Sequence, residues 1–162
     1  ELQDKGVLAQ CNVNVLQLLD VTEYENYQSE LKYLLEQKDR LDYIAGLITN
    51  IKDSGNTLVL VDRINAGKEL ESGKVIIATY GVAAVGINIP RIFNLVLLEP
   101  GKSFVRVIQS IGRGIRKAED KDFVQIWDIT STCKFAKRHL TKRKAFYREA
   151  AYPFTIQKLD WK

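Results

Sequence analysis

The chain has 162 residues, of which 46% are hydrophobic, 27% are charged and 9% are aromatic. This composition suits one domain with at most a small appendage, and it excludes a disordered chain, a collagen and a disulfide-rich miniprotein. The net charge of +4 is unevenly divided, because residues 1–100 carry −5 and residues 101–162 carry +9. The basic second half predicts a polyanionic partner, nucleic acid first, although a solvated basic helix explains it equally well.

The sequence contains no sign of a membrane or secretion segment. No apolar run approaches the roughly 18 residues of a membrane span, and residues 1–10 are too polar for a signal peptide. Cys11 and Cys133 predict free thiols in a reducing compartment, and we expect no metal site. Because the chain lacks methionine even at position 1, we expect it to be a fragment or a processed piece.

The first third predicts an entry segment and two helices. Residues Asn12–Leu18 alternate loosely and indicate a strand or a linker that enters the domain. Thr22 is expected to cap a helix that extends to Gln37, and Asp39 to cap a second helix. The sequence Ser54–Asn56 is expected to end that second helix.

Short, almost continuous apolar runs dominate the middle of the chain. Such runs are typical of buried strands in a parallel sheet whose two faces are covered by helices. Helix-like segments lie between several of the runs, and this alternation predicts an α/β domain with a mainly parallel sheet. The runs are Thr57–Val61, Lys74–Ala78, Phe93–Leu98 and Phe123–Ile129.

One connection between these strands is short. Only Ile64–Gly73 separates the first two runs, whereas a parallel crossover needs roughly a dozen residues or more, its helix included. Either the two strands are not neighbours in the sheet, or a segment is absent from this chain. We favour the absence.

The last third predicts a basic helix from Cys133 to about Ala151, which Pro153 ends. Its apolar stripe alternates with many cations, and residues 134–148 contain no acid. Residues 152–162 are interpreted as a C-terminal tail.

The first question is whether the sequence contains a loop that binds the phosphates of a nucleotide. Gly101-Lys102-Ser103 follows a strand and opens a helix, as a phosphate loop does, but Val96 stands where that loop requires glycine. No acidic cluster suited to magnesium follows an apolar strand. The chain by itself is therefore not expected to hydrolyse ATP.

The segment Ala78–Pro90 follows the second strand directly. Thr79 and Gly81 come at the carboxyl end of that strand, where open α/β sheets place their ligands. A hydroxyl and a glycine backbone suit contact with a nucleic-acid phosphate, and Gly86 with Asn88 forms a second point of close approach. A glycine-containing turn before an ordinary strand is the alternative.

A second segment, Gln109–Lys117, combines paired glycines with arginines. On a continued helix Gln109, Arg113 and Arg116 share a face other than the apolar stripe. Gly112 and Gly114 weaken a helix, so the alternative is that Arg113–Arg116 lie on its unwinding end. Two guanidinium groups beside an amide suit the binding of a polyphosphate. The alternative is an ordinary surface helix with scattered arginines, which could have the same sequence.

These two segments resemble motifs V and VI of the superfamily 2 helicases and translocases, in the second RecA-like motor domain. Gln109, Gly112, Arg113 and Arg116 match the motif VI pattern Q/H-x-x-G-R-x-x-R. Ala78–Pro90 resembles the motif V pattern A-T…G-I-D-I-P, except that Asn88 replaces aspartate, and Leu58–Arg63 resembles motif IV. Within the superfamily the sequence looks most like the branch of phage UvsW-type and XPB-type DNA helicases. The resemblance covers about residues 40–150.

The resemblance implies a nucleotide site shared with a first motor domain that is missing here. Arg113 and Arg116 would contact the γ-phosphate of ATP, with Arg116 as the arginine finger and Gln109 beside them as the third catalytic residue. Gly86 and Asn88 would lie next to the nucleotide. ATP and Mg²⁺ would be bound mainly by the missing N-terminal domain.

The resemblance also implies contacts with DNA, single-stranded or branched. Thr79, Gly81 and Arg63 would touch the backbone of the tracked strand. Five further cations are assigned to DNA on charge alone. They are Lys102, Arg106, Arg138, Lys142 and Arg143.

The expected organisation is a linker or entry strand over residues 1–20, a RecA-like three-layer α/β domain over 21–151 and the C-terminal tail. The family has a helix, a strand and a helix between motifs IV and V, so we expect a segment to be absent near Glu71–Ser72. The expected function is the C-terminal motor of an ATP-dependent DNA helicase in recombination or repair, in the cytoplasm of a bacterial or phage-infected cell and without a membrane. A stand-alone basic nucleic-acid-binding module and the motor part of a restriction-enzyme subunit are the alternatives.

Overall fold

The structure is a computed structural model, and it describes residues 11–62, 75–85, 94–101, 104–115 and 124–162. The strands are β1 (Cys11–Leu18), β2 (Thr57–Val61), β3 (Val75–Thr79), β4 (Asn94–Leu98), β5 (Val124–Ser131) and β6 (Phe154–Leu159). The helices are α1 (Tyr27–Glu36), α2 (Lys38–Lys52), α4 (Tyr80–Val85), α5 (Phe104–Ile115) and α6 (Lys134–Glu149).

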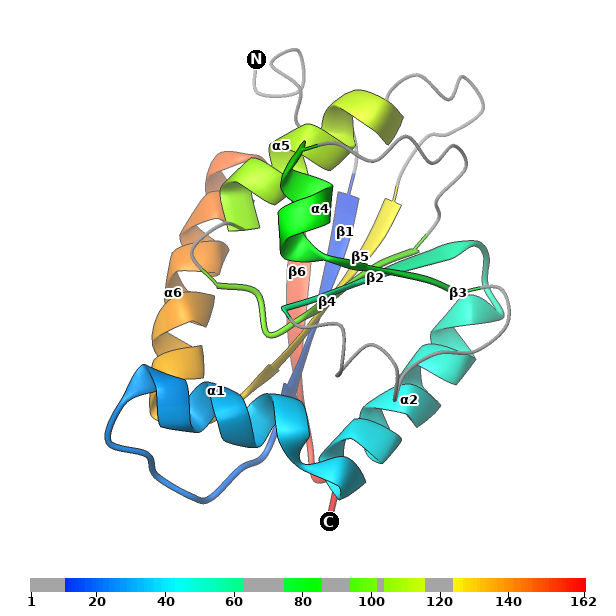
Figure 1. The fold of residues 1–162 in the computed structure, drawn as a ribbon. Helices are drawn as coiled ribbons and strands as arrows, with labels where there is room; N and C mark the ends of the chain where they lie inside the picture. The colour runs from blue at the N-terminus through cyan, green and yellow to red at the C-terminus, as the bar shows by residue number, and fades with distance from the viewer. Residues whose placement is uncertain (1–10, 63–74, 86–93, 102–103, 116–123) are drawn as a thin grey trace.

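The six strands form one sheet in the order β3-β2-β4-β5-β1-β6, and every pairing is parallel. Helices cover both faces of this sheet (Figure 1). The predicted α/β class and its parallel sheet are therefore confirmed.

The core divides into two layers because successive side chains of a strand point to opposite faces. In β1, Val13 and Val15 pack with α4, α5 and α6, whereas Leu16 and Leu18 pack with α1 and α2. The four predicted apolar runs correspond to β2, β3, β4 and β5. Of these, β2 and β4 are buried along their whole length, whereas β3 at the edge is only partly buried. Burial on both faces explains why these strands read as continuous apolar runs.

The first predicted helix begins later than expected. Its cap is Asn26, whose side-chain oxygen accepts a hydrogen bond from the Ser29 N–H at 2.9 Å, and not Thr22. The chain near Thr22 is held beside β5, since Thr132 bonds both the N–H and the carbonyl of Asp20 and the Cys133 thiol points to the Thr22 carbonyl. A backbone tied in this way leaves the helix to begin after it.

Both ends of the described chain belong to the sheet. Residues 152–162 were interpreted as a tail, but they contain β6, which pairs with β1 from Phe154 to Leu159. Its exposed residues 155–158 lack an apolar run, which is why the sequence pattern did not predict a strand. The segment Cys11–Leu18 is likewise a strand between β5 and β6 and not a linker.

The short connection joins neighbouring strands. β2 and β3 pair directly, so the explanation that they lie apart in the sheet is wrong. The predicted absence near Glu71–Ser72 falls outside the described residues. Cys11 and Cys133 are both buried and form no disulfide, as the sequence predicted.

A buried carboxylate joins the two helices of one face to the ends of three strands. Asp20, just after β1, accepts hydrogen bonds from Tyr33 of α1 at 2.8 Å, from Trp161 at 3.1 Å and from Ser131 of β5. Its main partner is Arg40 of α2, which is completely buried and whose guanidinium binds both carboxylate oxygens at 3.1–3.2 Å. Burial alone would raise the pKa of Asp20, but Arg40 and these donors outweigh it and lower that pKa.

Glu99, just after β4, is the second acid of this cluster and is less well paired. One oxygen accepts from Arg40 at 3.3 Å and the other from Thr130 at 3.1 Å. Burial therefore prevails over the nearby arginines and raises the pKa of Glu99 to about 7. Its backbone also has a φ of 46°, in the left-handed region that few non-glycine residues adopt.

The raised pKa makes Glu99 a source of pH-dependent stability. The folded chain holds this proton more tightly than the unfolded chain, so the contribution of Glu99 to stability falls as the pH rises from about 4.5 to about 7. We expect Glu99→Gln to become more stable relative to wild type between pH 5 and pH 8. The free energy of unfolding of the variant minus that of wild type should therefore increase over this range. Urea denaturation at both pH values measures it, with the exposed Glu23→Gln as control. A difference that does not change with pH would contradict the prediction.

Candidate nucleotide and nucleic-acid interface

Thr79 ends β3 and directly precedes α4. Its hydroxyl oxygen accepts a hydrogen bond from the Val82 N–H at 3.2 Å and so caps the first turn of that helix. Gly81 in the same turn is exposed, and a Cβ placed there would meet only the Thr79 hydroxyl, at 3.9 Å. Packing among the described residues therefore does not require glycine at this position, and the backbone is open to close approach by a ligand.

Tyr80, between these two residues, fixes the turn against the sheet. Its side chain is buried, and its hydroxyl donates a hydrogen bond to the Leu98 carbonyl oxygen at 2.8 Å. Because Leu98 ends β4, this bond sets the position of the α4 turn relative to the next strand. Sequence reasoning missed this role, and an aromatic residue between Thr79 and Gly81 was the available signal.

The α5 helix brings the second predicted segment beside the first. Phe104, Val107 and Ile108 face the core, while Arg106 is exposed and Gln109 is half-buried. The neighbouring α4 packs against α5, so the segments that resemble motifs V and VI lie on adjacent elements. The helix continues through Gly112 and Gly114 to Ile115.

Several predicted site residues cannot be placed. Arg113 lies within α5, but its side chain is outside the described part of the structure. The other predicted residues outside the described ranges are Arg63, Gly86, Asn88, Lys102 and Arg116. Their assignments remain predictions.

The basic helix α6 separates its cations into two kinds. Arg138 and Lys142 are exposed, so both are available to a nucleic-acid backbone. Arg143 is only 3% exposed, and its assignment as a DNA contact is corrected here. Its spacing gave the warning, because it lies three residues after Leu140 and four before Tyr147, on the buried stripe of the helix.

Arg143 instead forms a bidentate ion pair inside the domain. Its Nε and Nη2 donate to the two carboxylate oxygens of Asp128 at 2.7 and 2.9 Å, and its Nη1 donates to the Pro100 carbonyl at 2.8 Å. The Tyr147 hydroxyl donates to Asp128 at 2.7 Å. Burial opposes the charge, but Asp128 outweighs it and raises the pKa of Arg143. The pair thus ties α6 to β5 and to the start of the loop that leads into α5.

Two adjacent residues of α6 give a direct test of this division. We expect Arg143→Gln to lower the free energy of unfolding by about 3–5 kcal/mol, because the Asp128 carboxylate stays buried without its counter-ion. We expect Lys142→Gln to change it by less than about 0.5 kcal/mol, as is usual at an exposed position. Urea denaturation at pH 7 measures both, and equal effects would show that the assignment of Arg143 to the interior is wrong.

The described residues contain no metal site of the ordinary kind. Among them, no three histidine, cysteine, aspartate or glutamate side chains gather closely enough to hold an ion. In the same part of the chain, no helix is long and apolar enough to cross a membrane.

An aromatic contact between α1 and α6 was also missed from the sequence. The Tyr27 ring lies 5.0 Å from the His139 ring, centre to centre, and 6.4 Å from that of Phe135. No local sequence pattern shows which distant helix Tyr27 contacts.

The chain matches no protein-family model. It is 24% identical over 186 residues to the ATP-dependent DNA helicase UvsW of Enterobacteria phage T4, and this match covers 90% of the chain and 37% of UvsW. The chain is homologous to UvsW. The crystal structure of T4 UvsW shares its fold, with a TM-score of 0.79 over 94% of this chain and 42% of that one, at 19% identity.

The match covers only part of UvsW. The chain spans about two-fifths of the length of UvsW, which is consistent with one RecA-like domain of a superfamily 2 helicase. The match to UvsW is also longer than the 162 residues of this chain. UvsW therefore has residues within this span that have no counterpart here.

Proposed function

We propose that the chain is the C-terminal motor domain of an ATP-dependent superfamily 2 DNA helicase or translocase. The homology to UvsW, over nine-tenths of the chain, carries this proposal. The adjacency of α4 and α5 supports it, because motifs V and VI act together in that family. DNA recombination or repair, through unwinding of branched DNA in the cytoplasm of a bacterial or phage-infected cell, is the process we assign to the whole protein.

In this proposal α5 presents its carboxyl end to ATP. Arg113 and Arg116 neutralise the charge that develops on the transferred phosphoryl group, with Arg116 as the finger and Gln109 beside them. Gly86 and Asn88 approach the nucleotide from the segment after α4. The N-terminal motor domain holds most of the ATP and its Mg²⁺, so this domain completes the site only when the two close together.

The second function of the domain in this proposal is to bind DNA. We assign contacts with the DNA backbone to Thr79 and Gly81 at the start of α4, and we assign Arg63 and Lys102 to the same contacts. The exposed cations Arg106, Arg138 and Lys142 extend this contact surface. Each closure on ATP and each reopening would then move the strand along.

We also infer that a segment of the family fold is absent between β2 and β3. The two strands pair directly, although residues 62–74 alone connect them. The described β3 is the last strand on its side of the sheet and is only half-buried, with Ile76 48% exposed. A further strand and its helices beside β3 would cover it, and the greater length of the UvsW match supports this inference.

The arginine finger gives the most direct test of the ATP role. In the protein that carries both motor domains, Arg116→Ala should reduce DNA-stimulated ATP turnover by about 10³-fold or more. Its affinity for DNA without nucleotide should stay nearly unchanged, because the finger contacts only ATP. Steady-state ATPase rates and fluorescence anisotropy with an oligonucleotide measure the two quantities, and Lys158→Ala on the exposed face of β6 is the control. Unchanged turnover would refute the assignment.

Sequencing the gene upstream of Glu1 and across Leu70–Lys74 tests the domain organisation. We expect a G-x-x-x-x-G-K-[ST] segment followed by an acidic magnesium motif upstream, because the second motor domain needs a first. A reading frame that opens just before Glu1 would overturn the ATP role.

The charge on α6 favours a second candidate, a nucleic-acid-binding module without ATP chemistry. Exposed cations on this helix have no acid among residues 134–148 to neutralise them. Under that function Arg138→Gln would dominate DNA affinity, and the slope of affinity against salt would fall by roughly one. The motor part of a restriction-enzyme subunit would share every motif, and attached nuclease or methylase domains would distinguish it.

A further inference from the structure

A cavity of about 350 Å³ lies between the start of α5 and the middle of α6. Gly101, Phe104 and Val105 form one side, and His139, Lys142 and Arg143 form the other. We call this cavity the α5–α6 pocket. Its lining is mostly apolar, its volume is within the range of ligand sites, and no carboxylate is among the described residues that line it.

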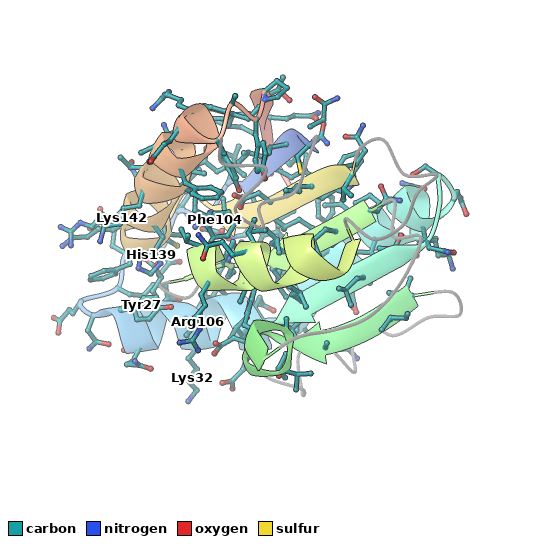
Figure 2. All side chains as sticks on the ribbon, turned by 90° about the horizontal axis from the view of Figure 1, so that it is seen from above. Tyr27, Lys32, Phe104, Arg106, His139 and Lys142 are labelled. Atoms are coloured by element: carbon teal, nitrogen blue, oxygen red, sulfur yellow. The ribbon has the colours of Figure 1, made fainter. Side chains whose placement is uncertain are left out.

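Aromatic rings border the pocket at its α1 side. Figure 2 shows Tyr27, His139 and Phe104 gathered there from three different helices. The Tyr27 hydroxyl would lie only 3.3 Å from a Cβ on Gly101, so this tyrosine reaches the wall of the pocket. Phe104 is buried beneath, whereas the partly exposed rings of Tyr27 and His139 offer edges and faces to a ligand.

Two exposed cations belong to the elements that form the pocket. Lys142 of α6 is one of its lining residues, and Arg106 of α5 directly follows the lining residue Val105. In Figure 2, Arg106 projects from α5 between α4 and the labelled Tyr27. Arg106 therefore lies on the helix that both lines the pocket and packs against α4.

A mostly apolar lining with aromatic rings and cations at the same cavity fits one chemistry well. A nucleobase stacks on aromatic rings, and its phosphate is attracted to lysine or arginine nearby. The bases of a duplex are stacked on one another and cannot enter, so the occupant is a single-stranded base. Burial, with Asp62 and Glu99 nearby, raises the pKa of Tyr27, so its phenol stays protonated and able to donate to a base.

We propose that the α5–α6 pocket receives one unstacked base of the DNA strand that this domain binds. Tyr27 and His139 contact the base, and Lys142 and Arg106 contact the phosphates beside it. The inference rests on the proposed DNA-binding function and adds to it a base-stacking site apart from the segments that resemble motifs V and VI.

The test uses a fluorescent 12-residue single-stranded DNA and a matched set in which one base at a time is removed. Wild-type chain should lose about 10-fold in affinity when the base that enters the pocket is missing, a loss typical of one stacked base. Tyr27→Leu and His139→Leu should bind the intact strand about as weakly as wild type binds that abasic strand. They should show no further loss with it, and their affinity for duplex DNA should stay unchanged.

Matched variants separate stacking from charge and from folding. Tyr43→Leu removes a partly buried tyrosine from α2 and should leave the affinity unchanged. Lys142→Gln should lower the salt slope by about one, and Lys158→Gln should not. Circular dichroism checks that each variant is folded, and the abasic series on wild type needs no variant.

The outcomes distinguish the two proposals. DNA binding by wild type with no loss at any abasic position would overturn the pocket and leave the DNA-binding function standing. No binding of any DNA would overturn both. Binding of free dTMP as tight as that of the strand, with no effect of Lys142→Gln, would make the pocket a mononucleotide site and refute this inference.

Discussion

The carboxylate of Asp20 is the constraint on which the rest of the domain depends. It lies where β1 ends, and it accepts from α1, α2, β5 and the residues after β6. A buried charge is tolerated only when it is paired and hydrogen-bonded, and here Arg40 is as deeply buried as its partner. These donors can meet at one carboxylate only when the sheet and both helices of this face are in place. The cluster therefore specifies one arrangement of the elements, which apolar packing alone does not do.

The sequence predicted the elements whose local pattern matches their environment. Buried parallel strands such as β2 and β4 have no polar face, and their continuous apolar letters reveal them. The edge strand β6 failed this test, because its exposed residues carry no such run. The start of α1 was misplaced because contacts with Thr132 and Cys133, more than a hundred residues away, hold the chain near Thr22.

The candidate interface divides in the same way. The sequence predicted Thr79 and Gly81 at a strand end and Gln109 on a helix, where the structure has them. That this helix packs against α4 was shown only by the structure. The assignment of Arg143 to DNA was wrong because it rested on charge alone. The sequence shows that Arg143 is a cation, but it does not show that a buried acid, Asp128, pairs with it. The α5–α6 pocket could not be predicted, because its two sides come from segments that meet only in the folded chain.

The position of β1 in the sheet determines when this strand can pair during folding. β1 is the first described strand, yet it pairs only with β5 and β6, and its Cys11 aligns with Val124. Such distant pairings slow folding, because the entropy cost of closing a long loop comes before any stabilising contact forms. During synthesis, more than a hundred further residues must follow β1 before its neighbour β5 exists. Until then β2, β3 and β4 could associate among themselves, and the waiting first strand would expose its apolar residues to other chains or to a chaperone.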